Sequence, residues 1–497
     1  MKIKIILMFL FAFLLTVPQV TFAQEEETTD EFGDFDATNA MDQQSSLGAL
    51  LGYTSIGGQS YIGMRIQPEF ALGKLGFGLD IPLLFSVEGN GIRTEEFESG
   101  VGWLRLVRYV RWGIKKQDPV YLKVGDLTGE SIGYGILLDN YTNSISYEKR
   151  KVGLSWDILI KNMVGIEGLY SDFDAGSFNL FAIRPYVKPF GRTRIPIIRT
   201  TDMGFTYITD KDQTFIETDI KDDDGNVIST EKVKTNEFLD KGVSAWAFDV
   251  GVIPVSMSFM QLKVYAQYGN LVKNKSEIFE AARAFEASSG IASTDSARLV
   301  DYEGGNGFGV GVDFKFKAGG NVLRVDARLE RLWYKKYFMP QFFDANYEIS
   351  KDGRYWELVS TEAKKGIYGG LSITALDKVR VGGTLMIPDD FSEEAPAMLT
   401  LNLDASKLME KFIITGQYVK GGLADLSDAF TLDERSLLTA RFAYKMYKFL
   451  VVGMDYRWTW SIMEDGTYKV DNYATPYIGL HIPFGEKKDS NINIDDE

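Results

Sequence analysis

The feature that most constrains the fold of this chain is an alternation of apolar and polar residues, which recurs from about residue 47 to residue 485. In the segment 307–317, GFGVGVDFKFK, every second residue is apolar over about ten residues. Successive side chains of a β-strand point to opposite faces, so the pattern predicts strands with one apolar and one polar face. Similar runs occupy residues 75–83, 151–160, 262–268, 322–333, 399–404, 438–445 and 452–460.

The lengths of these runs, and of the connections between them, distinguish two kinds of β protein. Soluble strands average about five or six residues, whereas these runs reach about ten, the length of a tilted membrane-crossing strand. Short connections, such as 258–261 and 447–450, alternate with long ones, such as 210–244 and 270–306. Short turns at one end and long loops at the other are typical of outer-membrane barrels. The other short connections are 318–321, 375–378 and 407–411, and the other long ones are 335–366, 423–436 and 464–473.

We therefore predict an all-β chain, a transmembrane antiparallel up-and-down β-barrel over residues 47–485, with short periplasmic turns and long extracellular loops. Following the chain gives about nine strands before the loop at residue 210 and about eleven after it, hence about 20 within a range of roughly 16–22. The alternation is weakest in two of these predicted strands, at 125–143 and 190–202.

The two ends of the chain lie outside the predicted barrel. Residues 1–23 combine two lysines, an uncharged apolar run at 5–17 and small residues before a cleavage point, which is typical of a cleavable Sec-type signal peptide. Residues 24–46 are polar, acidic and without periodicity, which predicts a disordered leader. Residues 486–497 form a polar, acidic tail. No segment has the roughly 18 uninterrupted apolar residues of a transmembrane helix.

Composition removes several classes of function. The chain has 497 residues, no cysteine, one histidine and a net charge of −15. Thiol catalysis, a disulfide scaffold and an iron–sulfur cluster all require cysteine, and a single histidine leaves little room for zinc. The acidic balance argues against nucleic acid as a partner, because no basic excess exists to release counterions. We predict no catalytic residue, no cofactor and no metal site, and we do not expect an enzyme.

The last alternating run, 477–484 (YIGLHIPF), ends in an aromatic residue. It resembles the carboxy-terminal β-signal of porin-like outer-membrane β-barrel proteins of Gram-negative bacteria, with the tail following it in this chain. The segment 121–143, YLKVGDLTGESIGYGILLDNYTN, is similar to a glycine-rich stretch of specific-channel porins. The resemblance implies a location in the cell outer membrane, contact with outer-membrane lipid, and insertion by the barrel-assembly machinery during biogenesis.

Four further motifs each allow a functional and a structural interpretation. His481 has no accompanying nucleophile motif, so a polar lumen residue is favoured over a general base. Residues 221–226, KDDDGN, favour a hairpin turn, because the glutamate of a calcium loop is missing. The glycines of 307–311 lack the spacing of a dinucleotide loop and are predicted to face the lumen and leave it open. Residues 276–288 predict a short helix, which either constricts the pore or packs over its mouth.

Charged residues that share one strand face are the candidate functional residues. The run 323–330 places two arginines and two carboxylates on one face, and each would cost several kcal/mol in lipid near the midplane. They are predicted to form a polar channel wall or, alternatively, a salt-bridged network that fills the lumen. A barrel of about 20 strands is too wide for side chains alone to fill, which favours the channel. The predicted lumen-lining residues are Arg324, Asp326, Arg328, Glu330, Asp313, Lys315, Lys317, Lys263, Arg441, Lys445, Asp455 and Arg457.

These observations predict a porin-like outer-membrane channel through which small polar solutes diffuse passively. The alternative is a non-conducting outer-membrane barrel that presents its extracellular loops to a partner, as an adhesin or a component of an assembly or secretion system would. Because charges of both signs alternate on 323–330, a channel lined in this way should discriminate weakly by charge.

Overall fold

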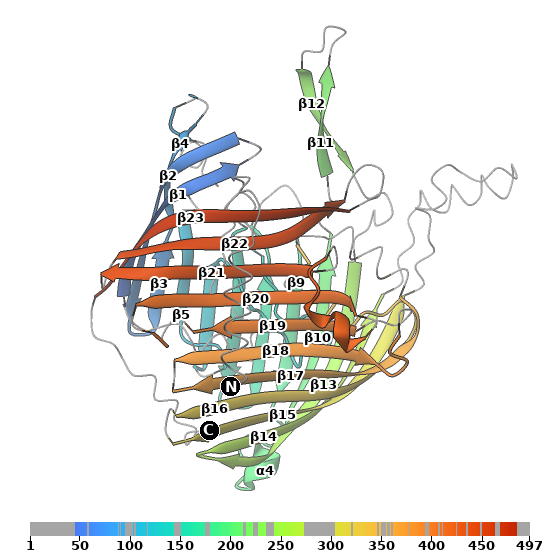
Figure 1. Ribbon diagram of the computed structural model, residues 1–497. Coiled ribbons are helices and arrows are strands. Elements are labelled where there is room, and N and C mark those ends of the chain that lie inside the picture. Colours follow the sequence, from blue (N-terminus) through green and yellow to red (C-terminus); the bar gives the residue numbers. More distant parts are fainter. Residues whose placement is uncertain are drawn as a thin grey trace, which may run out of the picture.

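Almost all strands of the chain belong to one antiparallel sheet (Figure 1). The computed structural model describes residues 45–484. The gaps longer than three residues in this description are 95–102, 144–150, 174–178, 222–226, 235–242, 273–303, 349–353, 393–396 and 463–467. The predicted signal peptide (1–23), tail (486–497) and helix (276–288), and almost all of the leader (24–46), lie outside the described residues.

The large sheet has the following strands in chain order. They are β1 (Ser45–Ile56), β2 (Gln59–Leu72), β3 (Leu75–Leu79), β4 (Ile81–Ser86), β5 (Val107–Trp112), β6 (Val120–Gly125), β7 (Gly153–Ile160), β8 (Val164–Tyr170), β9 (Phe181–Val187), β10 (Asp202–Asp210), β13 (Val243–Met257), β14 (Met260–Leu271), β15 (Gly305–Ala318), β16 (Leu323–Tyr334), β17 (Lys364–Ala375), β18 (Val379–Pro388), β19 (Ala397–Asp404), β20 (Phe412–Leu423), β21 (Ser436–Tyr447), β22 (Leu450–Ile462) and β23 (Tyr468–Phe484).

Pairing between the first and last strands closes this sheet. Gly48 of β1 lies opposite Gln67 of β2 on one side and opposite His481 of β23 on the other. Elsewhere each strand pairs with the next strand of the sheet along the chain, and β3 and β4 both pair with β2, so that these two fill one position. The 21 strands of the sheet therefore fill 20 positions among the described residues. The predicted fold class, an all-β antiparallel up-and-down barrel of about 20 strands, is confirmed.

Three details of the predicted strand pattern are wrong. Residues 126–143 form no strand, because they leave the wall and pack against its inner face. Residues 190–201 are a connection that contains the short helix α4 (Pro196–Arg199). The connection predicted at 464–473 is shorter, because β23 already pairs with β22 from Tyr468.

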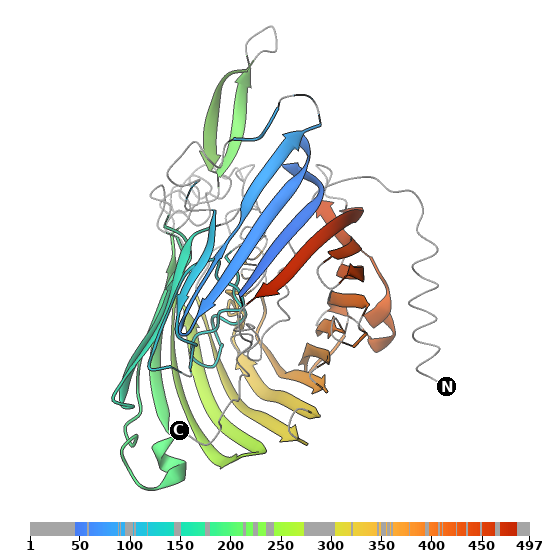
Figure 2. The same cartoon turned by 90° about the vertical axis from the view of Figure 1, so that its left-hand side faces the viewer.

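The two ends of the barrel carry different connections. Tight turns follow β2, β7, β13, β15, β17 and β21 at the end where α4 lies, and the long connections leave from the opposite end (Figure 1 and Figure 2). From the long-connection end projects a separate hairpin, β11 (Phe215–Lys221) paired with β12 (Val227–Lys234). The predicted hairpin at this place is confirmed, and its turn, 222–226, lies outside the described residues.

No helix among the described residues is long and apolar enough to cross a membrane.

The apolar side chains lie on the outer face of the wall and the charged side chains on its inner face, which is the reverse of a water-soluble protein. On β6, the outward side chains of Val120, Leu122 and Val124 are 37–38% exposed, whereas the inward Tyr121 and Lys123 are 3% and 4% exposed. Apolar groups thus lie on the outside and a charged group lies within. The same pattern follows β10, β13 and β15, where the exposed side chains include Met203, Phe205, Phe248, Val250, Phe308 and Val310.

Candidate functional site

Two segments of the chain fold into the barrel interior. The first inserted segment, residues 126–143, lies in the connection from β6 to β7, and the second inserted segment, residues 335–344, follows β16. They pair with each other, since the backbone N–H of Phe343 donates to the Leu137 carbonyl at 3.0 Å and that of Gln341 to the Ile136 carbonyl at 2.9 Å. The interior of the barrel is therefore partly occupied by its own loops.

The inserted segments share one apolar cluster with the wall. Tyr141 of the first segment and Phe342 and Phe343 of the second have no exposed surface. Their neighbours are inward residues near the long-connection ends of the strands. These wall residues are Leu169, Ala182, Ile208, Val243, Ala245, Ala247 and Leu271. The segments are consequently packed as core, and this core lies towards the long-connection end of the barrel.

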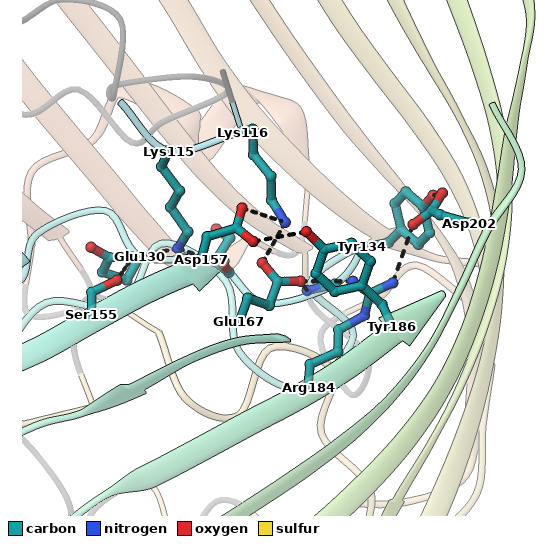
Figure 3. A network of polar contacts seen from close by, with 12 residues as sticks. Lys115, Lys116, Glu130, Tyr134, Ser155, Asp157, Glu167, Arg184, Tyr186 and Asp202 are labelled. Atoms are coloured by element: carbon teal, nitrogen blue, oxygen red, sulfur yellow. Dashed lines mark hydrogen bonds and ion pairs between the residues drawn. The ribbon is translucent and has the colours of Figure 1, made fainter. Parts of the chain in front are cut away.

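A layer of charged side chains lies inside the wall, nearer the tight turns than this core. Figure 3 shows the members of this layer. Its centre is Arg184 on β9, which is 1% exposed and pairs with Glu167 at 2.8 Å, with Asp202 at 3.2 Å and with Asp249. Arg184 can serve three carboxylates because its planar guanidinium has five N–H donors. The charges of this layer are thus largely satisfied by one another rather than by water.

Two consecutive lysines of the β5–β6 connection extend this layer. Lys116 pairs with Glu167 and lies 3.4 Å from Asp157, whose Oδ1 also accepts a hydrogen bond from the Tyr186 hydroxyl at 2.9 Å (Figure 3). Lys115 reaches the first inserted segment, with its Nζ 2.5 Å from Glu130 Oε2. A connection at the tight-turn end therefore contributes charges to the interior.

Electrostatics keep the Lys115–Glu130 pair ionised. Burial alone would lower the pKa of Lys115, but the carboxylates of Glu130, Glu167 and Asp157 together outweigh burial and hold this pKa above its ordinary value of 10.5. Burial alone would raise the pKa of Glu130, but the charges of Lys115 and Lys123 hold it below its ordinary value of 4.5. Ser155 supports the charged carboxylate with a hydrogen bond of 2.9 Å.

Tyr134, at the tip of the first inserted segment, joins that segment to the wall strands β10 and β14. Its ring stacks on Tyr265 of β14, with the ring centroids 4.5 Å apart and the planes inclined by 10°. Its hydroxyl donates to Asp202, and its backbone carbonyl accepts from Arg328. A Cβ atom at Gly251 would overlap the Tyr134 hydroxyl, so glycine on β13 makes room for this contact.

Inward glycines elsewhere accommodate buried polar side chains in the same way. A Cβ atom at Gly204 would overlap the guanidinium of Arg184, and one at Gly309 would overlap the carboxylate of Glu330. Gly307 and Gly311 lie under Phe338 and Tyr265, respectively. The glycines of 307–311 belong to β15, as predicted, but they make room for side chains rather than for open lumen.

The four charged residues predicted on the inward face of β16, which are Arg324, Asp326, Arg328 and Glu330, lie in two different environments. Glu330 is buried and the Arg328 side chain is 11% exposed; the two lie 3.0 Å apart, and Arg328 also contacts Asp139 of the first inserted segment at 3.3 Å. Arg324 and Asp326, nearer the tight turn, are half-buried. Both alternatives that the sequence left open therefore occur on this strand. Arg328 and Glu330 belong to a salt-bridged network, and Arg324 and Asp326 belong to a partly exposed wall.

Strand register brings most of the other predicted residues together. Lys317 lies opposite Arg324, Lys315 opposite Asp326, and Asp313 opposite both Arg328 and Lys263. On the other side of the barrel, Arg441 lies opposite Asp455, Arg457 opposite Thr439, and Lys445 opposite Val451. That these residues line a conducting pore stays a prediction.

The charged layer around Arg184 was not predicted from the sequence. The signals were present, because Glu167 and Arg184 interrupt apolar strands with the same parity as inward neighbours. Tyr134 carried no comparable signal, since its partners on β10 and β14 are far away in the sequence.

No metal centre is apparent in this interior. Among the described residues, no group of three or more His, Cys, Asp or Glu side chains is arranged to hold a metal ion. The single histidine, His481, lies on β23 opposite Gly48 of β1. Its assignment as a polar lumen residue stays a prediction.

Comparisons with known proteins yield structural likenesses only. No family model matches the chain, and no curated protein matches it. The chain is similar to the solved structure of Pseudomonas aeruginosa OccK5 (OpdH), with 12% identity, a TM-score of 0.34, and coverage of 89% of this chain and 98% of that one. It is also similar to the ferric-catecholate import receptor Fiu of E. coli K12, with 10% identity, a TM-score of 0.35, and coverage of 89% of this chain and 82% of that one. For Pseudomonas aeruginosa OpdL the identity is 8% and the TM-score 0.32, with coverage of 89% of this chain and 99% of that one. Likenesses at this level carry no argument about function.

Proposed function

We propose that the chain is an outer-membrane channel that admits small polar solutes by passive diffusion. Residues 1–23 would direct export and be removed, the closed sheet of residues 45–484 would form the membrane barrel, and residues 24–44 and 485–497 would remain outside it. Outer-membrane lipid and the barrel-assembly machinery would be its partners in the envelope.

The observation that supports this proposal is that the outer face of the barrel wall is apolar and exposed, whereas its inner face carries the charged side chains. Exposed apolar side chains recur on outward faces around the barrel, among them Leu122 of β6, Phe248 of β13 and Leu329 of β16. Water-soluble monomers rarely expose contiguous apolar patches beyond a few hundred Å². A closed sheet also satisfies the backbone groups that lipid leaves without partners. Both properties support lipid as the solvent of the outer surface.

The uneven filling of the interior supports a passage. The inserted segments cover the inner wall from β8 to β14, where they pack with Leu169, Ala247 and Leu271. Inward residues on β18 to β21, such as Thr384 and Gln417, remain half-buried. A water-filled path along this uncovered wall would explain why polar side chains are retained there.

Planar-bilayer recording of the refolded chain tests the channel directly. We expect stepwise insertions, each with a current that rises with salt concentration and shows weak preference for either sign of ion. Outer-membrane fractionation of the chain without such steps would overturn the channel. It would favour the alternative of a non-conducting barrel, for which the buried inserted segments and the projecting β11–β12 hairpin are the supporting observations.

A further inference from the structure

The uncovered inner wall carries a band of uncharged polar side chains, here called the neutral strip. Strand register places them side by side across β17 to β21. Asn402, for example, lies between Gly382 on one neighbouring strand and Gln417 on the other, and Gln417 lies opposite Thr439. The strip consists of Ser372, Thr384, Thr400, Asn402, Gln417 and Thr439.

The side chains of the neutral strip have no hydrogen-bond partners among the residues that the structure describes. Asn402 is the most informative of them, because it is only 7% exposed and its Oδ1 is buried without a partner. Gly382, which lies opposite Asn402 on β18, has no side chain that could bond to this amide. Buried polar groups in proteins are normally hydrogen-bonded, so an unpartnered amide in a half-exposed polar row indicates a place for a visiting donor.

The opposite wall differs in this respect. There Arg184, Glu167 and Asp157 are buried and engaged with one another or with lysines. Hydrogen-bonding capacity on that side is already used within the protein. Within the described part of the two walls, it is therefore the neutral strip that offers a row of unengaged donors and acceptors to a molecule in the interior.

The rows that border the neutral strip define what such a molecule meets next. Towards the tight-turn end, the adjoining inward row is charged and includes Arg380, Asp404 and Arg441. Towards the long-connection end, Met386 and Met398 are paired, and Met398 is 41% exposed. A solute would thus pass an apolar row, then the uncharged polar row, then a row of mixed charge.

We propose that the neutral strip binds uncharged polyhydroxylated solutes, namely sugars and polyols, as they pass through the channel. This inference rests on the proposed function. Hydroxyl and amide groups both donate and accept, which matches the hydroxyls of such solutes, while their C–H faces can contact the methionines. An ion would lose part of its hydration at the strip, where the flanking charges lie only at the two ends, with Asp326 opposite Ser372 and Arg457 opposite Thr439.

Vesicle swelling with three solutes of similar size tests the inference. Glucose, gluconate and glucosamine differ in charge, and we expect glucose to enter vesicles that contain the wild-type chain fastest. Replacing Thr400→Val and Gln417→Leu together should slow glucose entry by roughly five-fold per lost hydrogen bond while ion current is retained. Thr206→Val, on the covered wall of β10, is the matched control and should leave glucose entry unchanged.

A second variant changes the charge of the neutral strip without changing the shape of its side chains. Asn402→Asp preserves the side-chain outline but adds a negative charge, so it should shift the preference from glucose to glucosamine. Ion current with equal entry of all three solutes, or glucose entry unaffected by the variants at the strip, would overturn the inference while leaving the channel in place. Absence of both current and swelling in the wild-type chain would instead overturn the proposed function.

Discussion

Lys115 and Glu130 form a buried ion pair that fastens the first inserted segment to the β5–β6 connection. The pKa of Glu130 is lowered, so its stabilising contribution is present above pH 4.5 and is lost as the pH falls through the lowered pKa. The pKa of Lys115 is raised, so its contribution is present below pH 10.5 and is lost as the pH rises through the raised pKa. The pair therefore holds the segment throughout the neutral range.

Glu130→Gln should leave the charge of Lys115 buried without its paired carboxylate. We expect the free energy of unfolding at pH 7 to fall by about 3–5 kcal/mol, the usual cost of breaking a buried pair. In the double variant Glu130→Gln with Lys115→Met, most of the loss should be recovered. Urea titrations in lipid vesicles at pH 7 and pH 3 measure both effects. A single variant as stable as the wild type would contradict the anchoring role.

The residues of the site differ in how far sequence could reveal them. Arg328 and Glu330 were predicted to face inwards, because strand parity alone fixes the face of a side chain. Their buried partners could not be predicted, since Asp139 lies far away in sequence, within a segment that has no regular period. Gly309 was also assigned to the inward face, but only the structure shows that Glu330 occupies the space above it.

At the scale of elements, the alternation of apolar and polar residues predicted the strands. Each wall strand has one face towards the outside and one towards the interior, so its side chains alternate with a period of two. The first inserted segment has an irregular backbone and contacts both the apolar cluster and the charged layer, so residues 126–143 mix apolar and polar side chains without a period of two. For this reason the strand predicted at 125–143 had only weak alternation and does not exist in the structure. The helix predicted as a possible constriction, at 276–288, lies outside the described residues, whereas two other segments occupy the interior.

The first inserted segment should act as the constriction of the proposed channel, with Tyr134 holding its tip. Tyr134→Ala removes an aromatic stack worth about 1 kcal/mol and a hydrogen bond to a carboxylate worth about 1.5–3 kcal/mol. Together they favour the docked tip by roughly a hundred-fold in population. Single-channel current should therefore become larger and noisier in the variant.

Tyr207→Ala is the matched control for this change, because Tyr207 lies on the outward face of β10 and is 38% exposed. It should leave the current unchanged. If Tyr134→Ala gave the wild-type current, the tip would not limit conduction, and the passage would have to lie wholly along the neutral strip.

For the whole molecule, the outward face of β16 indicates where lipid should begin and end. Leu329, at mid-strand, is 56% exposed, whereas Arg331, nearer the long-connection end, pairs with Asp389 and lies over the Trp333 ring, 5.4 Å from its centroid. Charged and indole groups of this kind are typical of the membrane–water interface. The apolar belt should therefore lie between this level and the tight turns.

This placement predicts opposite outcomes for one substitution on the two faces of the barrel. Val325→Arg should lower the free energy of unfolding in vesicles by about 2–4 kcal/mol, because Val325 lies on the outward face of β16 between the level of Arg331 and the tight turn, so that the new charge would face lipid near the midplane. Thr439→Arg, on the inward and half-buried face of β21, should cost much less, since the guanidinium can meet water and the carboxylate of the mixed-charge row. Urea titrations of both variants in vesicles compare the two costs, with folding into detergent as a reference that lacks a bilayer. Equal stability of the two variants would show that the outer surface is not in lipid, and the interior would then have to be reinterpreted as the core of a water-soluble barrel.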